Sequence, residues 1–253
     1  MKKLLKFSLS GLLAHYKVSY TNTSKLTYSI PTFTSIEGLL GAILGFDKWD
    51  YHIKINRENL YIGIKVNNRI DKLMLTLNQI DFINPIPKKD NKEEYGLIKE
   101  RNQIQMEHIF KPSYTFYIYY KNNPNIYNDL LRNVLNRKSV YPLYFGSAYC
   151  LAQFEEVKEI NFEEKEINDN YENILTVLPF DKNIDIKIHG KKLFILQENI
   201  PYIRDIDFTM KEYKKVIFNP LGDNNGIECK GNFYKTEDDE LIYLFGNQND
   251  KIS

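Results

Sequence analysis

The stretch from Phe7 to Gly45 reads FSLSGLLAHYKVSYTNTSKLTYSIPTFTSIEGLLGAILG, and its hydrophobic period changes along its length. From residue 5 to residue 10 apolar and polar side chains alternate, as expected for a half-buried strand. Residues 15–32 are rich in Ser, Thr and Tyr and predict a long loop or irregular hairpin. From residue 34 to residue 44 apolar side chains recur at helical spacing. The stretch therefore predicts a strand, a polar loop and a helix, in that order.

The predicted helix has clear end signals and several glycines. Thr34 and Glu37 have the spacing of a capping box, and Gly45 supplies a C-terminal stop. Gly38, Gly41 and Gly45 lie toward a common side of the predicted helix. Each glycine inside a helix costs about 1 kcal/mol of helix stability relative to alanine. Such a helix must gain from close approach to a sheet or to the backbone of a ligand, and packing on a sheet is the favoured interpretation. The glycine spacing matches neither a dinucleotide-binding motif nor a phosphate-binding loop.

The rest of the first 160 residues alternates between strand and helix patterns. Strands are predicted at 59–66 and 71–83, and a polar excursion at 84–104. Residues 105–120 return to alternation and end in the aromatic strand SYTFYIYY (113–120), before a helix at 126–137 and a last strand from 143 onward. The order strand, helix, strand, strand, helix, strand is the ferredoxin-like pattern. We therefore predict an α+β, ferredoxin-like domain over 1–160, with the excursion around 84–104 as a hairpin or flap.

Residues 161–253 are predicted to form a smaller, β-rich region. Short β segments recur there with few helical patterns between them, at 174–179, 184–188, 193–197, 215–219 and 241–245. We expect this region to pack on or beside the first domain.

The composition is that of a globular protein. Hydrophobic residues make up 43% and charged residues 26% of the 253 residues, unlike disordered or membrane proteins. No stretch approaches the roughly 20 apolar residues of a membrane span, and Lys6 interrupts a leucine-rich start that superficially resembles a signal peptide. Cys150 and Cys229 lie far apart without a partner motif, which favours a reducing compartment. We predict a cytoplasmic protein without a membrane partner.

Charge is unevenly distributed, although the net charge is only +1. Residues 1–36 contain five lysines and no acidic residue, whereas residues 155–172 contain eight acids against two lysines and residues 237–240 are all acidic. The basic start predicts a surface that attracts phosphates, and the acidic stretches are interpreted as solvated faces. Tyrosines interleave with lysines and hydroxyls in the basic start, a mixture typical of surfaces that follow a nucleic-acid backbone and stack its bases.

Specific residues of the same stretch resemble the amino-terminal signature of the CRISPR-associated Cas five family, a branch of the RAMP superfamily, and most of all its type I-B members. The matching residues are Gly11, Leu13, Ala14, His15, Tyr16, Tyr20, Thr21, Thr23, Ser24, Thr27, Tyr28, Pro31 and the helix up to Gly45. The segments MEHIFKPSYTFYIYY (106–120) and YPLYFGSAYCLAQF (141–154) also look like family blocks. Beyond Phe154 the chain is similar to the family only in general character.

The resemblance implies an RRM-type RAMP domain in which the excursion between the second and third strands forms a thumb. It implies a non-catalytic subunit of a type I Cascade surveillance complex, which binds the 5′ handle of the CRISPR guide RNA (crRNA) in antiviral defence. The implied partners are the backbone subunit (Cas seven), the large subunit (Cas eight) and target DNA near the protospacer-adjacent motif. No cofactor is implied.

The chemistry of the matched block predicts how RNA is contacted. Lysines and hydroxyls would contact phosphates and 2′-hydroxyls, tyrosines would stack on splayed bases, and the start of the helix would offer backbone donors to a phosphate. The predicted RNA-binding residues are His15, Tyr16, Lys17, Tyr20, Thr21, Thr23, Ser24, Lys25, Thr27 and Tyr28. No catalytic residue and no metal ligand is predicted.

Two alternatives stay open. One branch of the family, found in type I-C systems, cleaves guide precursors, which makes a metal-independent endoribonuclease the main rival. It would draw on His15, His108 with Lys111, and Tyr20 for proton transfer and phosphate stabilisation. The similarity to type I-B members disfavours this activity. The other alternative is a scaffold that holds neighbouring subunits through its β-rich end without reading RNA.

Overall fold

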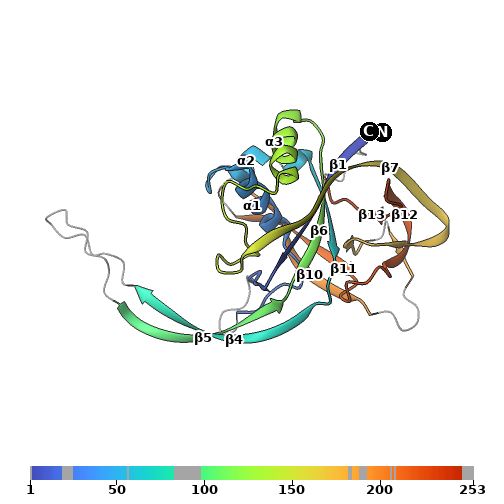
Figure 1. Ribbon diagram of the computed structural model, residues 1–253. Coiled ribbons are helices and arrows are strands. Elements are labelled where there is room, and N and C mark those ends of the chain that lie inside the picture. Colours follow the sequence, from blue (N-terminus) through green and yellow to red (C-terminus); the bar gives the residue numbers. More distant parts are fainter. Residues whose placement is uncertain are drawn as a thin grey trace.

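The central sheet of the protein has the strand order β7-β1-β6-β3, with antiparallel neighbours. Figure 1 shows the computed structural model as a ribbon. Its elements are β1 (Lys2–Gly11), α1 (Phe33–Leu44), β3 (Leu60–Val66), β6 (Ser113–Tyr120), α3 (Pro124–Leu135) and β7 (Ala152–Ile174). This chain order and this strand order confirm the predicted ferredoxin-like α+β fold. The structure describes residues 2–18, 25–55, 57–82, 98–181, 184–187, 193–205, 207 and 209–246.

Both faces of this sheet are covered, which explains its long runs of apolar residues. Leu5, Phe7 and Leu9 of β1 belong to the core cluster that also contains the buried residues of α1 and α3. Leu4 faces the opposite side and packs there with Tyr117 of β6. Strand β6 is buried at seven of its eight positions. Many of the aromatic residues therefore serve the core, as expected for a β-rich protein.

The C-terminal part of the chain provides the second cover. Strand β12 (Ile227–Thr236) pairs with β7, and β13 (Leu241–Ile242) pairs with β12, so the central sheet continues beyond the ferredoxin-like strands. A few residues later, Phe245 exchanges two backbone hydrogen bonds with Ile62 of β3, at the opposite edge. The sheet thus curls until both of its edges meet the same C-terminal segment, which leaves no open edge at these positions.

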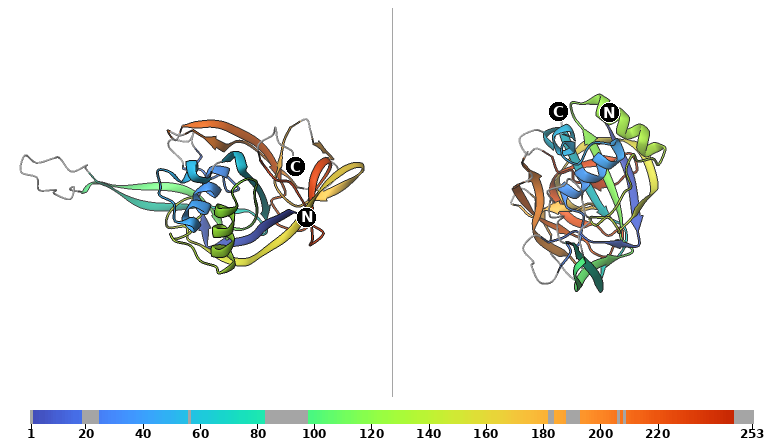
Figure 2. Two further views of the ribbon diagram at one scale, coloured as in Figure 1. Left: turned by 90° about the horizontal axis from the view of Figure 1, so that it is seen from above. Right: turned by 90° about the vertical axis from the view of Figure 1, so that its left-hand side faces the viewer.

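A long two-stranded arm is inserted between the second and third strands of the ferredoxin-like order. Strands β4 (Asp71–Phe82) and β5 (Ile98–Phe110) pair antiparallel, and the pair projects away from the rest of the molecule in Figure 1 and in the left view of Figure 2. The short strand β2 (Leu13–Ala14) pairs with the base of β5. The predicted excursion at 84–104 is therefore too narrow, because the paired arm already begins at Asp71. Residues 83–97 lie outside the described residues.

The predicted aromatic strand SYTFYIYY is confirmed as β6, and the alternation before it belongs to a separate strand, β5. Strand β5 ends at Phe110 and β6 begins at Ser113, and Lys111 between them adopts a φ of 47°. This left-handed turn, followed by a proline, redirects the chain from the arm back into the central sheet.

A second sheet covers the start of α1. It has the order β10-β11-β8, built from β10 (Ile195–Arg204), β11 (Met210–Phe218) and β8 (Leu178–Pro179). Phe33 of α1 contacts Tyr202 of β10 with 5.0 Å between the ring centroids. A further short strand, β9 (Asp185–Ile186), pairs with β12. The C-terminal third is thus β-rich, as predicted, although the pattern had not indicated β12.

The structure has no break at the predicted boundary between residues 160 and 161, because β7 runs through it. This strand pairs with β1 in its first half and with β12 in its second half. Strand β7 begins at Ala152, whereas the last strand was predicted to begin at residue 143. The predicted start is wrong because residues 143–151 form an irregular loop. The largest core cluster combines Leu5 with Val216, from opposite ends of the chain.

The start of α1 differs from the prediction. Its N-cap is Thr32, whose hydroxyl accepts a hydrogen bond from the backbone N–H of Ser35 at 3.2 Å. Thr34 and Glu37 lie inside the helix and are buried, so the predicted capping box is wrong. Gly45 ends the helix in the left-handed conformation with a φ of 76°, as predicted.

The glycines of α1 face a short helix rather than the sheet. A Cβ added to Gly41 would lie 2.9 Å from the Cβ of Tyr51, the first residue of α2 (Tyr51–Ile55). Helix α3 begins at Pro124 after the N-cap Asn123, close to its predicted position, and a 3₁₀ turn (Arg57–Asn59) precedes β3. No helix among the described residues is long and apolar enough to cross a membrane.

Candidate nucleic-acid interface

The predicted RNA-binding stretch forms a hairpin at the base of the arm. Lys17 bridges to Thr27, and Tyr28 donates its backbone N–H to the carbonyl of Tyr16 at 2.9 Å. The hairpin is tied to β5, since Glu107 donates its N–H to the carbonyl of Lys25 at 2.9 Å. The arm and the matched block therefore form one structural unit, although they lie far apart in the sequence.

The predicted contacts fall into three groups. Tyr20, Thr21, Thr23 and Ser24 lie outside the described residues, and their roles stay predictions. The side chain of Lys17 is exposed and that of Lys25 is half-buried, so these two cations lie on the outer side of the hairpin. The remaining four, His15, Tyr16, Thr27 and Tyr28, are all buried.

The two described tyrosines of the hairpin serve the core. Tyr28 is fully buried and donates its hydroxyl to the carbonyl of Asn199 at 2.7 Å. Tyr16 is 2% exposed and packs against Phe145, with 6.4 Å between the ring centroids. Burial raises the pKa of Tyr16 well above its ordinary value. Neither ring offers a face to a base, which argues against the stacking role predicted for both.

Thr27 holds the hairpin together. Its hydroxyl accepts a hydrogen bond from the N–H of Tyr16 at 2.8 Å and donates to the carbonyl of Tyr28 at 2.9 Å. Its own N–H donates to the carboxylate of Glu107 at 3.1 Å, and Lys72 of β4 pairs with the same carboxylate at 3.1 Å. These contacts are internal to the fold, so the structure gives Thr27 a scaffolding position.

The structure brings together His15 and His108, which come from the hairpin and from β5. Their ring centroids are 5.3 Å apart. Nδ1 of His15 lies 2.8 Å from the carbonyl of Glu107, and Nδ1 of His108 lies 3.0 Å from that of Met106, so each Nδ1 must carry a proton to donate. Nε2 of His108 lies 2.9 Å from the hydroxyl of Tyr149.

The environment favours the neutral form of His15. Burial lowers its pKa, and the nearby charges of His108 and Lys25 act in the same direction. The hydrogen bond to the carbonyl of Glu107 and the carboxylate of Glu107 oppose this change without outweighing it. At neutral pH His15 is therefore an uncharged donor to the arm rather than a cation for a phosphate.

An exposed aromatic loop next to these histidines was not recognised from the sequence. Tyr141, Tyr144 and Tyr149 are 49%, 43% and 51% exposed, in the irregular segment between α3 and β7. The loop is anchored at Gly146, which has a φ of 84° and where a Cβ would overlap the carbonyl of His15. Pro142 and Gly146 are turn residues, and they were the signal that this segment is a loop rather than a strand.

The basic start is not the free phosphate-attracting surface that its charge predicted. Lys3 pairs with Glu159 of β7 at 2.9 Å. Lys6 is buried and pairs with Asp238 at 3.0 Å and with Glu240 at 2.6 Å. The acidic stretches thus supply counter-charges and are not simply solvated faces. The antiparallel pairing of β1 with β7 places Glu159 beside Lys3, and the turn after β12 places Asp238 and Glu240 beside Lys6.

No three His, Cys, Asp or Glu side chains in the described part of the chain gather in a way that could hold a metal ion. The chemistry offered by the site is instead that of exposed aromatic faces and cations beside a projecting arm. Such surfaces stack bases and follow a phosphodiester backbone.

The ferredoxin-like sheet carries a two-stranded arm between its second and third strands, which is the architecture that the resemblance to RAMP proteins implied. The family model described as "CRISPR-associated protein (Cas_Cas5)" matches residues 4–202. The chain therefore belongs to the Cas five family. This confirms the resemblance seen in the first 45 residues and extends it through the arm and into β10.

Solved structures support the fold over nearly the whole chain. A CRISPR protein from Archaeoglobus fulgidus matches with a TM-score of 0.57 and 12% identity, over 97% of this chain and 99% of that one. A chain of a CRISPR RNA-guided surveillance complex matches with a TM-score of 0.50 and 9% identity, over 97% and 95% of the two chains. Comparison with curated protein sequences finds no match.

Proposed function

We propose that the protein is a non-catalytic subunit of a type I CRISPR surveillance complex (Cascade) that binds the 5′ handle of the crRNA in the cytoplasm, in antiviral defence. The observation that carries the proposal is the projecting β4–β5 arm, with exposed tyrosines, the exposed Lys17 and the half-buried Lys25 near its base. An extended single strand passing this point would find a cation for its phosphates and flat rings for its bases. Membership of the Cas five family supports the proposal.

The exposed loop changes which tyrosines are expected to contact RNA. Tyr144 and Tyr149 take the stacking role that was predicted for Tyr16 and Tyr28, since only exposed rings can accept a base. Lys17 and Lys25 keep their predicted role as phosphate contacts. The four residues of the hairpin outside the described part of the chain keep theirs as well.

Two parts of the fold are assigned to different partners in this proposal, the arm and the β-rich C-terminal region. The arm would contact the backbone subunit (Cas seven), because a long β-ribbon that projects from the body can reach a neighbouring subunit. The β-rich C-terminal region would contact the large subunit (Cas eight) or target DNA near the protospacer-adjacent motif. No membrane or cofactor enters the proposal.

The RNA-binding part can be tested by charge reversal. Lys17→Glu together with Lys25→Glu should weaken binding of fluorescently labelled handle RNA in anisotropy titrations. The slope of log affinity against log salt should fall by about 0.7 for each phosphate that the variant no longer neutralises. Lys235→Glu, on β12, is the matched control, and its affinity should equal that of the wild type. Equal affinity of the wild-type protein for handle and scrambled RNA would contradict handle recognition.

The rival activity, metal-independent cleavage of repeat RNA, is favoured by one observation. His15 and His108 lie ring to ring, and the hydroxyl of Tyr149 contacts Nε2 of His108. Two histidines in contact are the groups that general acid–base cleavage of RNA requires. Their burial and their hydrogen bonds to backbone carbonyls oppose this role, since neither ring is open to a substrate.

Incubation of purified protein with labelled repeat RNA in EDTA separates the two functions. Intact RNA supports the binding subunit. Discrete cleavage that is lost in His108→Ala or His15→Ala, while handle binding persists, would replace the proposal with the endoribonuclease.

A further inference from the structure

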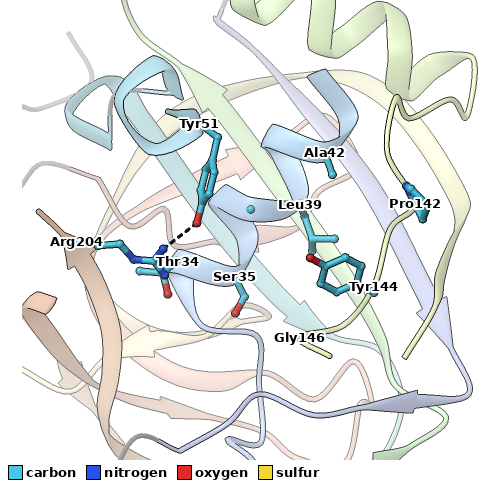
Figure 3. Close-up of a pocket in the computed structure, with 10 residues that line it drawn as sticks. Thr34, Ser35, Leu39, Ala42, Tyr51, Pro142, Tyr144, Gly146 and Arg204 are labelled. Carbon is cyan, nitrogen blue, oxygen red and sulfur yellow. Dashed lines mark hydrogen bonds between the residues drawn. The ribbon is translucent and has the colours of Figure 1, made fainter. Parts of the chain in front are cut away.

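A cavity of about 210 Å³ lies beside α1 (Figure 3). Tyr51 and Arg204 stand on one side of the helix, and Pro142 and Tyr144 of the exposed loop stand on the other. The residues that line it are Thr34, Ser35, Gly38, Leu39, Ala42, Tyr51, Pro142, Tyr144, Gly146 and Arg204. These ten include an arginine, which can donate hydrogen bonds to acceptor atoms of a ligand, and no carboxylate.

Gly38 has no packing explanation among the described residues. A Cβ added there would meet no atom of the described part of the chain closer than the hydroxyl of Tyr51, at 4.0 Å, whereas a Cβ on Gly41 would lie 2.9 Å from the Cβ of Tyr51. Gly41 is therefore required by helix packing, and Gly38 is not. Glycine is the least favourable ordinary residue inside a helix apart from proline. Gly38 therefore leaves this side of the helix open onto the cavity.

Tyr144 and Arg204 indicate what kind of ligand fits the cavity. Tyr144 is 43% exposed, so its ring can receive a second flat group on its free face. Arg204 donates from Nη1 to the hydroxyl of Tyr51 at 2.9 Å, which fixes the guanidinium at the opposite wall. A planar cation and a tyrosine ring across a narrow apolar floor of Leu39 and Ala42 are the elements that bind a splayed nucleobase.

The size of the cavity sets the scale of the ligand. It is smaller than the roughly 300–1,000 Å³ of sites that enclose a drug-sized molecule, so it suits a single base and not a dinucleotide. The loop that supplies Tyr144 also supplies Tyr149, which contacts His108 at the base of the arm. A strand that passes the arm thus has a second contact point on the same loop.

We propose that this cavity takes one unstacked nucleobase of the bound RNA, stacked on Tyr144 and facing Arg204 through its hydrogen-bond acceptors. The inference rests on the proposed RNA-binding function and adds a site for a single base. The proposed site also explains why residue 38 is a glycine, because a methyl group at that position would occupy the floor on which the base lies.

The test uses the purified full-length protein and fluorescein-labelled RNA octamers of A, C, G and U, with an octamer of the same backbone whose residues are all abasic. The wild type should bind at least one base-containing octamer more tightly than the abasic one. Tyr144→Ala should lose about five- to 150-fold of this preference, the range of one base–aromatic stack, and Tyr144→Phe should keep it. Tyr213→Ala, a tyrosine of 42% exposure on β11, is the matched control and should behave as the wild type.

Gly38→Ala and Gly38→Leu distinguish ligand binding from structural damage. Gly38→Ala should melt at the same temperature as the wild type or above it, since alanine is the better helix former and meets no atom within 4 Å except the Tyr51 hydroxyl at that limit. Both variants should nevertheless weaken binding of the base-containing octamer and leave the abasic octamer unaffected.

Two results would overturn this inference and leave the proposed function standing. If the variants bind the base-containing and the abasic octamer as the wild type does, the cavity takes no part in RNA binding. If they lose equal affinity for the two octamers, the cavity contacts the RNA backbone and not a base. A wild-type protein that binds no octamer and no handle RNA would instead overturn the proposed function, and this inference with it.

Discussion

Glu240 links the C-terminal cover of the central sheet to the strands beneath it. Its Oε2 accepts hydrogen bonds from Nζ of Lys6 at 2.6 Å and from the hydroxyl of Tyr117 at 2.8 Å, and its Oε1 lies 3.0 Å from Nζ of Lys65. The side chains of Lys6, Lys65 and Glu240 are only 8%, 14% and 16% exposed. One carboxylate therefore compensates two largely buried cations, on strands β1 and β3.

Glu240→Gln keeps the size of the side chain and removes its charge. Removing one partner of a buried ion pair costs about 3–5 kcal/mol, because the other charge stays buried without compensation. Asp238 still lies 3.0 Å from Lys6, so we expect a loss near the lower end, about 3 kcal/mol. For a chain of this size each kcal/mol shifts the melting temperature by roughly 2–4 °C. The variant should therefore melt about 6–12 °C below the wild type.

The same network predicts a pH dependence. Burial alone would raise the pKa of Glu240, but the hydrogen bond from Lys6, the charge of Lys65 and the hydroxyl of Tyr117 together lower it below its ordinary value of 4.5. A carboxyl whose pKa is lower in the folded state stabilises the protein above the unfolded value and loses that contribution as the pH falls through the folded value. Acid unfolding should therefore steepen below pH 4.5, and less so in Glu240→Gln.

Circular dichroism melts at pH 7 and urea titrations measure both effects. Asp239→Asn is the control, because its pair with Lys235 is exposed and screened by solvent, and its melting temperature should match the wild type. A Glu240→Gln protein that melts within 2 °C of the wild type, or no lower than the control, would refute the reasoning. The two lysines would then find compensation elsewhere.

Three further predictions concern the hairpin, α1 and the histidine pair. Tyr28→Phe should destabilise the protein by about 1 kcal/mol in urea titrations, because it removes a hydrogen bond to a carbonyl of β10. Tyr16→Phe should be neutral or stabilising, since that buried hydroxyl has no hydrogen-bond partner in the described part of the chain; equal losses in the two variants would contradict this. Gly41→Ala should lower the melting temperature by crowding Tyr51, and a melt at or above that of the wild type would mean that α2 moves aside. Burial lowers the pKa of His15, so the unfolded chain takes up this proton first and stability should decline as the pH falls below 6.5; a urea midpoint that is the same at pH 5.5 and pH 7.5 would count against a buried neutral ring.

Local pattern was sufficient for the ferredoxin-like part of the fold. The alternation of β1, the helical spacing before Gly45 and the apolar strand β3 each depend on neighbours in sequence, so their type could be read without the rest of the chain. The polar composition after residue 83 likewise indicated an excursion from the sheet. The Cas five resemblance rested on the same local block. What these signals located least well were element ends, such as the N-cap at Thr32.

The candidate site was only partly predictable, because exposure depends on what covers a residue. Tyr16 and Tyr144 have the same side chain and both lie in segments with further tyrosines, yet one is 2% and the other 43% exposed. His15 and His108 were both singled out, but only the pairing of β2 with β5 brings their rings together. The exposed loop was missed because its alternating apolar residues have the pattern of a strand.

The amino-acid sequence by itself determined the order of strands and helices, the arm between the second and third strands, and the family to which the chain belongs. Only the tertiary structure decided which faces stay open. Periodicity shows that Lys6 lies on the face of β1 opposite Leu5, and a single sheet would leave it in water. The C-terminal segment curls over that face and places Glu240 on Lys6, a contact between residues 234 positions apart. No local pattern encodes a partner at that distance, so neither the buried charges nor the exposed tyrosines could be assigned before the chain was folded.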